Sequence, residues 1–382
     1  MEFASGHNPV GTNRSKGRYA GIGLYATYLA LALSIISIGN VARAANAPEM
    51  ATSGQTNVSQ TGAFTYGIPI EVPPGSGGMA PSISLNYSSQ NGDNIAGLGW
   101  TISGLPSIGR CPRTLAQDPD PTTSNPVRYI HGAVTFQTTD RYCFGSQRLV
   151  PIGSGSGTVS YRTEVEGFSD ITAVGTAGQG PLYFKVRTKS GQTLYLGWSE
   201  DTDNSGNGSR LVIPTDNTTG REWAVEKIVD AVGNYLIVKY TDDTANAQIR
   251  PSTINYTLNK TAGLTTAPVA ITFHYLSRTD SGGNPIRVPT YLAGTRSQIT
   301  DILEDIQVSL NGTRVLYYKP VYSAPIDGSQ HYQLQSFQKC DGSTTTCLNM
   351  LHFGWQGGTG TVSFSQSPAT GQPRIRSPTL PI

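Results

Sequence analysis

The sequence predicts an all-β protein, built as a large antiparallel sheet that is rich in hairpins. Three features of the composition lead to this prediction. Charged residues make up 14% of the 382 residues, against about 25% in average proteins, which leaves little material for solvent-exposed helices. The 44 glycines and 24 prolines supply many turns. Tyrosine, which favours strands, outnumbers phenylalanine by 19 to 10.

The first 44 residues are typical of an export signal. Basic residues precede an apolar segment over 20–39, and small residues follow at Ala42 and Ala44. This pattern predicts a signal peptide helix over 1–44 that is cleaved after Ala44. The apolar segment is also long enough for an uncleaved membrane anchor. We expect an exported protein, located outside the cell, in a periplasm or on the cell surface, which meets the membrane only if this segment stays uncleaved.

The charges nearly cancel once this segment is removed. The loss of four basic residues and one acidic residue changes the formal charge from +2 to about −1. The remaining chain has no stripe of basic residues. We therefore expect no nucleic-acid partner.

A polar linker is expected over 45–62, and the first strands follow it. The segment from residue 64 alternates between apolar and polar residues on both sides of the turn sequence PPGSGG. Its apolar positions are Phe64, Tyr66, Ile68 and Ile70 before the turn, and Ile83, Leu85 and Tyr87 after it. This alternation predicts two strands joined by a turn.

A glycine-rich stretch, IAGLGWTISGLPSI, comes next. Gly97, Gly99 and Gly104 surround Trp100. Glycines beside a bulky indole let another strand approach closely and allow bulges. We predict that these four residues have an architectural role, as a turn between strands packed around the tryptophan.

Three further hairpins are indicated along the chain. The runs LYFKVRT and QTLYLGW flank residues 189–191, and REWAVEKIV and YLIVKY flank residues 230–234. Asn311-Gly312 is a strong two-residue hairpin signal. The segment SQITDILEDIQVSL, residues 297–310, has apolar residues at helical spacing and favours a helix when it is taken alone. Two last strand-like runs, HYQLQSFQKC and NMLHFGW, end the predicted sheet at about residue 356.

Four cysteines remain after the export segment, Cys111, Cys143, Cys340 and Cys347, and they allow three pairings. Sequence proximity favours Cys111 with Cys143 and Cys340 with Cys347, and an oxidising compartment would favour disulfides. A metal site is the less favoured alternative, because no C-x-x-C occurs and no histidine lies at ligand spacing from a cysteine.

The sequence carries no recognisable catalytic motif, so we expect neither an enzyme nor a cofactor. Glu164-Val165-Glu166 is the one E-x-E pattern, and two alternating glutamates in a strand are predicted to form a solvated face. His274 and His352 stand in strand-like runs and are predicted to be packed or edge histidines.

One loop contains a weak metal candidate. Asp201, Asp203 and Ser205 resemble the first half of a calcium-binding loop. The twelfth position of such a loop is Val212, which has no carboxylate. A polar surface turn is therefore the favoured interpretation of this segment.

Several blocks of the chain resemble the SpvB/TcaC family, which comprises the N-terminal regions of Salmonella virulence plasmid protein B and of insecticidal toxin-complex B components. The first and most specific block runs from GAFTYGIPIEVPPGSGG to GLPSIGRCPRTLAQD. Three further blocks follow in the order that the family leads one to expect: DRYCFGSQRLV, W-AVEKIVDAVGNYLIVKY and LQSFQKC...CLNMLHFGW. The resemblance covers about residues 62–356. Within the block that begins at Trp223, the D-x-x-G-N…Y unit at 230–240, with Asp230, Gly233 and Asn234, resembles one RHS-type repeat.

The resemblance implies a β-rich shell domain over 63–356, in which segment 297–310 is a strand. In such toxins this region joins RHS-repeat strands in a hollow shell around a toxic polypeptide, and family members also occur in the cytoplasm before release. Another toxin-complex or RHS polypeptide is the partner that the resemblance implies. Residues 357–382 are expected to be a tail that leads to a downstream region, because no propeller, RHS array or toxic domain is recognisable here.

The sequence therefore leaves three candidate functions. The first is a structural shell or scaffold component of an exported, RHS- or toxin-complex-type virulence protein. The second is a surface binding module that recognises a glycan or a protein partner through exposed tyrosines. The third is a remnant ADP-ribosyltransferase or a hydrolase, which is disfavoured because the expected motifs are missing.

Overall fold

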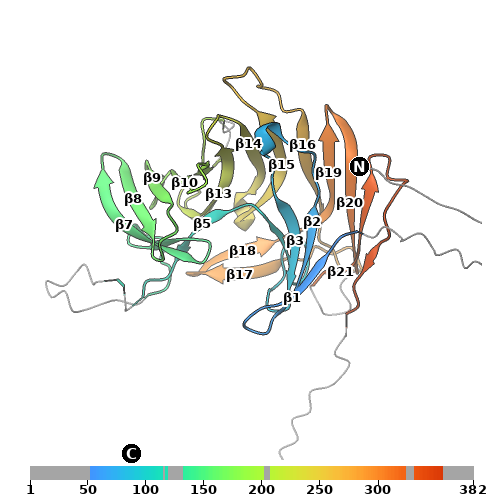
Figure 1. Cartoon of the computed structure of the whole chain (residues 1–382). Coiled ribbons are helices and arrows are strands. Elements are labelled where there is room, and N and C mark those ends of the chain that lie inside the picture. Colours follow the sequence, from blue (N-terminus) through green and yellow to red (C-terminus); the bar gives the residue numbers. More distant parts are fainter. Residues whose placement is uncertain (1–51, 115–116, 119–131, 202–206, 324–330, 356–382) are drawn as a thin grey trace, which may run out of the picture. The chain divides into compact units, whose positions relative to one another are not determined.

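The computed structural model describes residues 52–114, 117–118, 132–201, 207–323 and 331–355 (Figure 1). These residues form strands and turns, so the all-β prediction is confirmed. Among them there is no α-helix, and only two single turns of 3-10 helix occur, η1 (Ser76–Gly78) and η2 (Thr244–Asn246). The predicted signal peptide helix and the predicted tail both lie outside the described residues.

A small antiparallel sheet has the strand order β1-β2-β3-β4. Its strands are β1 (Gln55–Val58), β2 (Phe64–Ile70), β3 (Ile83–Ser88) and β4 (Trp100–Ser103). The predicted strands on either side of PPGSGG form the β2–β3 hairpin, in which Ile68 lies opposite Leu85. The fold differs from the sequence-based expectation at β1, which lies within the predicted linker. All four β1 residues are exposed, so no buried alternation marks this strand in the sequence.

A second, sixteen-stranded sheet contains most of the chain, and all of its pairings are antiparallel. Its strands are β5 (Ser107–Cys111), β6 (Arg141–Phe144), β7 (Gln147–Gly155), β8 (Thr158–Thr163), β9 (Asp170–Val174), β10 (Tyr183–Arg187), β11 (Thr193–Leu196), β12 (Arg210–Val212), β13 (Gly220–Val229), β14 (Tyr235–Asp243), β15 (Gln248–Leu258), β16 (Val269–Ser277), β19 (Asp301–Leu310), β20 (Thr313–Ser323), β21 (Gln333–Asp341) and β22 (Leu351–His352). A separate hairpin consists of β17 (Val288–Leu292) and β18 (Thr295–Ile299).

Strand β13 closes part of the large sheet into a ring. Its residues 222–224 pair with β5, and its residues 225–229 pair with β11. The strands from β5 to β11 pair in sequence order, so these two contacts close eight strands into a ring: β5, β6, β7, β8, β9, β10, β11 and β13. From β13 the sheet continues through β14, β15, β16, β19, β20 and β21 to β22.

The three predicted hairpins are confirmed, since residues 189–191, 230–234 and 311–312 connect β10 to β11, β13 to β14 and β19 to β20. In the last hairpin Leu310 lies opposite Thr313. Asn311 and Gly312 therefore form a two-residue loop, with φ angles of 49° and 77°. Positive φ at both loop positions matches the right-handed twist of the two strands.

The segment 297–310 forms strands, as the family resemblance implies and against its helical spacing. It contains the end of β18 and all of β19. In β19 both faces are largely buried, and a register irregularity separates Val308 from Ser309. Burial on both faces removes the alternation of polar and apolar residues that identifies a strand. The remaining apolar spacing then resembles that of a helix.

Buried residues of the two sheets form one continuous hydrophobic cluster. It includes Ile68 and Trp100 of the small sheet and Trp223, Ile254 and Phe337 of the large sheet. The two sheets are therefore packed together through their side chains, and the two buried tryptophans lie in the same core.

Candidate functional site

Trp100 is the centre of an aromatic cluster on the small sheet. It begins β4 and is 1% exposed. Its ring meets Phe353 edge-on with centroids 5.1 Å apart, and lies 5.4 Å from the ring of Tyr87 and 6.3 Å from that of Tyr66. Aromatic pairs of this kind add about 0.5–1.5 kcal/mol beyond the burial of their area. The cluster joins β2, β3 and β4 to the segment that follows β22.

The glycines around Trp100 are required by close approaches of the chain. Gly97, Gly99 and Gly104 all have positive φ. A Cβ atom at Gly104 would lie 1.9 Å from the carbonyl oxygen of Ser82, and one at Gly99 would lie 2.4 Å from the ring of Tyr87. Glycine is the residue that fits such positions without strain. In the described chain these glycines stand in turns at both ends of β4, whose pairing with β3 is regular.

Trp223, on β13, is the centre of a second aromatic cluster, which belongs to the ring of strands. Its side chain is fully buried, and its indole N–H donates a hydrogen bond of 3.1 Å to the carbonyl oxygen of Pro181. Its ring lies 5.4 Å from Tyr142 and 5.2 Å from Phe184, both in edge-on contact. Burial raises the pKa of Tyr142 to about 12, so this tyrosine stays neutral.

Arg110, which the sequence does not single out, connects this cluster to two loops and to the first residue of β13. Its fully buried guanidinium lies above the rings of Tyr142 and Trp223, 5.7 Å from each centroid. It forms an ion pair of 3.0 Å with the equally buried Asp140. It also donates to the carbonyl oxygens of Gly220, Gln137 and Gln179, at 2.7, 2.8 and 2.8 Å. Charge-assisted hydrogen bonds of this kind are strong, so they hold these backbone segments in place.

Asp230, Gly233 and Asn234 form a compact turn between β13 and β14. The Asp230 carboxylate accepts hydrogen bonds from the backbone N–H groups of Val232 and Asn234, and from the Asn234 side chain. These bonds hold the pKa of Asp230 below its usual value, although desolvation works in the opposite direction. Asn234 in turn accepts a bond of 3.0 Å from Asn259 on the neighbouring connection.

The same turn occurs a second time, between β16 and β17. Asp280 accepts from the backbone of Gly282 and Asn284 and from the Asn284 side chain. Sequence reasoning missed this copy, although both turns have the pattern D-x-x-G-N. A third D-x-x-G-N stands at 203–207, mostly outside the described residues.

Buried tyrosines tie the sheets to their connections. Tyr256 and Tyr318 of the large sheet donate to the carbonyl oxygens of Pro73 and Glu71, at 2.6 and 2.9 Å. Both acceptors belong to the connection between β2 and β3. Tyr240, Tyr275 and Tyr332 donate to other backbone carbonyls in the same way. The excess of tyrosine over phenylalanine therefore has a physical reason, because a phenyl ring would leave these carbonyls without a donor.

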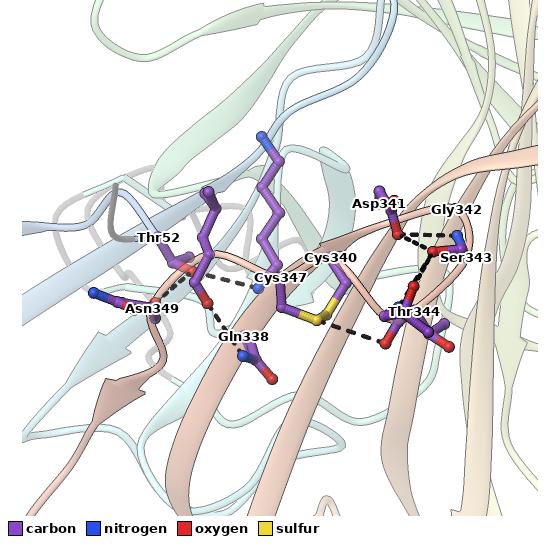
Figure 2. Close-up of a disulfide and its surroundings, with 12 residues drawn as sticks. Thr52, Gln338, Cys340, Asp341, Gly342, Ser343, Thr344, Cys347 and Asn349 are labelled. Carbon is purple, nitrogen blue, oxygen red and sulfur yellow. Dashed lines mark hydrogen bonds between the residues drawn. A yellow bond between two sulfur atoms is a disulfide. The ribbon is translucent and has the colours of Figure 1, made fainter. Parts of the chain in front are cut away.

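The structure joins Cys111 to Cys143 and Cys340 to Cys347. The first disulfide links the paired strands β5 and β6. Figure 2 shows the second, which closes a short loop after β21. In that loop Asp341 accepts from the backbone and hydroxyl of Ser343. Just beyond the loop, the carbonyl oxygen of Asn349 accepts from the backbone N–H and hydroxyl of Thr52.

We expect the two disulfides to differ in their contribution to stability. They close loops with sequence separations of 32 and 7. Replacing Cys111 and Cys143 by serine should lower the free energy of unfolding by about 3–4 kcal/mol, and the same change at Cys340 and Cys347 by about 2–3 kcal/mol. Urea unfolding of the two double variants measures this difference. An equal or reversed order would contradict the chain-entropy explanation.

The calcium candidate is only partly described, because Asp203 and Ser205 lie outside the described residues. Asp201 is bound by two lysines: Lys227 Nζ lies 2.5 Å from its Oδ2, and Lys260 Nζ lies 3.0 Å from its Oδ1. In the parts of the chain that the structure describes, no three His, Cys, Asp or Glu residues gather in a way that could hold a metal ion.

The other titratable residues that the sequence analysis considered lie apart. Glu164 and Glu166 follow β8 in an exposed loop rather than in a strand. His274, on β16, lies 2.7 Å from Asp305 Oδ1 on the adjacent strand β19. His352 is exposed on the short strand β22. The described geometry does not bring these residues together into a catalytic arrangement.

Asp118 forms a buried acidic centre beside the first disulfide. Its carboxylate accepts from Arg141 Nε at 2.6 Å, from the Thr114 backbone N–H at 2.7 Å and from Arg148. Desolvation works to raise the pKa of Asp118, but the bonds from Arg141, Thr114 and Arg148 prevail and lower it. The contacts stabilise the charged form, so the folded protein favours the carboxylate.

This centre predicts a loss of stability in acid. Because the pKa of Asp118 is lower in the folded chain than in the unfolded chain, its contribution is complete above the unfolded value of about 4 and is lost as the pH falls towards the folded value. In the Asp118→Asn variant, the free energy of unfolding should depend less steeply on pH below about 4. Urea titrations at several acidic pH values measure this slope, and an unchanged slope would refute the assignment.

Among the described residues, no helix has the length and hydropathy that a membrane crossing requires.

These contacts define a class of protein. It is a large antiparallel β domain that is stabilised by buried tryptophans, by hydrogen bonds from tyrosine hydroxyls to backbone carbonyl oxygens, and by internal ion pairs. A family profile described as Salmonella virulence plasmid 65kDa B protein, SpvB, matches residues 58–282, which is more than half of the chain. The chain belongs to the SpvB family. A search of curated proteins found no match.

Solved structures share this fold at low sequence identity. The TcdB2-TccC3 crystal structure superimposes with a TM-score of 0.57 at 18% identity, over 76% of this chain and 16% of that one. The Tc holotoxin pore of Photorhabdus luminescens gives 0.56 at 18% identity, over 76% and 15% of the two chains. The N-terminal domain of the effector protein SpvB from Salmonella typhimurium strain LT2 gives 0.53 at 15% identity, over 72% of this chain and 98% of that domain.

Proposed function

We propose that this chain is a structural shell or scaffold module of an exported, RHS- or toxin-complex-type bacterial virulence protein. Its task is to form a rigid wall by strand pairing and side-chain packing, and we assign it no catalysis and no cofactor. Family membership supports this proposal, as does a fold shared with chains of the TcdB2-TccC3 and holotoxin structures. By analogy, the partner is another toxin-complex or RHS polypeptide.

The continuous large sheet is the observation that carries the proposal. Fifteen strands follow one another along a single path of antiparallel pairs, with β12 added at the side. Two buried arginines in the described residues hold chain segments together. Arg110 binds two loops and the first residue of β13, and Arg278 binds Asp93 and Asn94 of the β3–β4 connection. The hydrogen bonds of these arginine side chains fix backbone segments, as a structural role requires.

Co-purification tests the proposed partner. The chain should be expressed together with the polypeptide that the adjacent downstream DNA encodes, and the mixture analysed by size-exclusion chromatography. A shell module is expected to elute with that polypeptide as one complex. Elution of the two at their separate positions, across a range of concentrations, would refute the shell assignment.

Export is the second part of the proposal. A cleaved signal peptide over 1–44 would release a chain that begins at Ala45. N-terminal sequencing of protein recovered from the culture medium or periplasm tests this. A mature chain that retains the apolar segment 20–39 and sediments with membranes would favour the anchor instead.

A surface binding module remains the second candidate, because the β17–β18 hairpin exposes an aromatic side chain. Tyr291 is 68% exposed on this hairpin. Exposed tyrosines are frequent in binding surfaces. A glycan array and a protein pull-down, each repeated with Tyr291→Ala, test this alternative. Binding that is lost with the tyrosine would support it.

A further inference from the structure

A row of aromatic side chains crosses one face of the small sheet. Tyr66 on β2 lies opposite Tyr87 on β3, and Tyr87 lies opposite Trp100 on β4. Directly opposed residues project from the same face, so these three rings share one face of the sheet. Phe64 stands two residues before Tyr66 on the same strand and therefore projects from this face as well.

The segment after β22 lies against this aromatic face. Phe353 meets the rings of Trp100 and Tyr66 edge-on, with centroids 5.1 and 5.6 Å apart. Trp355 meets Tyr87 in the same way, at 5.8 Å. The four rings of the sheet and these two line a cavity of about 370 Å³. The planes of contacting rings are inclined by 51° to 78°, so the rings enclose the cavity from several directions.

The walls of this cavity consist mainly of aromatic rings. Among the described residues that line it, Leu351 is the only aliphatic side chain, and none is Asp, Glu, Asn, Gln, Lys or Arg. Apart from the tyrosines, its polar side chains are Thr56 and His352. A primary ammonium group brings three N–H donors that need acceptors, and no carboxylate or amide side chain is present here to accept them. The walls therefore suit a group that has no N–H donor.

The second aromatic cluster of the molecule contains a cation of its own. The Arg110 guanidinium lies over the rings of Tyr142 and Trp223. In the part of the chain that the structure describes, lysines and arginines lie over eight rings, but over none of the six rings around the cavity. The face of an aromatic ring is negative and attracts a cation within about 6 Å of its centroid, and tryptophan does so most strongly. The six rings are thus available to a cation from outside the chain.

We propose that this cavity binds a quaternary ammonium group, such as the trimethylammonium group of choline. A quaternary ammonium carries a full positive charge but no N–H, so it needs ring faces and no hydrogen-bond acceptor. Enclosure by several aromatic rings is the usual way in which proteins recognise this group. The group can belong to a soluble molecule or to a lipid headgroup, and the experiments below separate these two sources.

Calorimetric titration of the full chain with choline tests the proposal. The matched probe is the neutral analogue of choline in which a tert-butyl group replaces the trimethylammonium group, because it keeps the shape and removes the charge. Choline should bind saturably, and at least about fivefold more tightly than this analogue, since the analogue lacks the cation–π attraction. The buffer is kept at about pH 8, where free imidazole is uncharged.

Phe64→Leu and Phe168→Leu form a matched pair of variants. Phe64 lines the cavity and is 46% exposed, so the smaller side chain should leave the sheet folded. Phe168 is 74% exposed in the loop after β8, away from the lining residues. Phe64→Leu should weaken choline binding about two- to fivefold and change the affinity for the neutral analogue little. Phe168→Leu should bind choline as the wild type does.

Three results would overturn the proposal: no saturable binding of choline, equal affinity for choline and its neutral analogue, or an equal effect of the two phenylalanine changes. Where choline binds as expected, vesicles of phosphatidylcholine and of phosphatidylglycerol identify the source of the group. Cosedimentation with phosphatidylcholine vesicles alone, reversed by free choline, assigns a lipid headgroup. Binding of free choline without cosedimentation assigns a soluble ligand.

Discussion

Replacing Trp100 by alanine is expected to lower the free energy of unfolding by about 3–5 kcal/mol. The indole is almost completely buried and contacts Tyr66, Tyr87 and Phe353, which come from two other strands and from the segment after β22. Removing it leaves a void between chain segments that are far apart in sequence, and the rigid glycine turns around it limit any collapse. Chemical unfolding monitored by far-ultraviolet circular dichroism measures the loss.

Trp198 provides the control for this variant. Its side chain is 37% exposed, and its ring contact is with Tyr183, 5.6 Å away. Trp198→Ala should therefore cost much less than Trp100→Ala, about 1 kcal/mol or below. A loss of less than about 1 kcal/mol for Trp100→Ala would contradict the architectural role that we assign to the glycine-rich stretch.

Strands with one buried face could be predicted from the sequence, and the others could not. β2 and β3 have the alternation that a half-buried strand requires, and the loop at Asn311-Gly312 has the residues that its positive φ angles require. β1 is exposed on both faces and β19 is buried on both. Neither strand shows an alternating pattern, so β1 resembled a linker and β19 a helix until the family resemblance was considered.

The aromatic and turn residues of the site were accessible from sequence, but its ionic contacts were not. Trp100 is surrounded by glycines that allow close packing, and Asp230 opens a D-x-x-G-N pattern that is typical of a turn. Arg110 pairs with Asp140, and Arg278 pairs with Asp93 far along the chain. Such partners are brought together by the pairing of distant strands, so no local spacing marks them. A local signal that was missed is the second D-x-x-G-N turn at 280–284.

Arg110→Met is the second variant with a large expected effect, a loss of about 3–5 kcal/mol in the free energy of unfolding. Methionine keeps much of the side-chain volume but leaves the buried Asp140 carboxylate without its cation. The carbonyl oxygens of Gly220, Gln137 and Gln179 also lose their donor. Leaving a buried charge unpaired costs more than losing the attraction between the two charges, so the unpaired Asp140 carboxylate should account for most of the lost stability.

Two further variants separate the charge from the packing. Arg162→Met removes a pair with Asp170 in which both side chains are exposed, and it should cost only about 0–1 kcal/mol. In Arg110→Met with Asp140→Asn, the uncompensated charge is gone, while the asparagine oxygen can still accept from Thr135 as Asp140 Oδ1 does. The double variant should therefore be more stable than Arg110→Met alone. If it is less stable, the network acts through its hydrogen bonds to the three backbone carbonyls, and burial of the ion pair is not the main source of its effect.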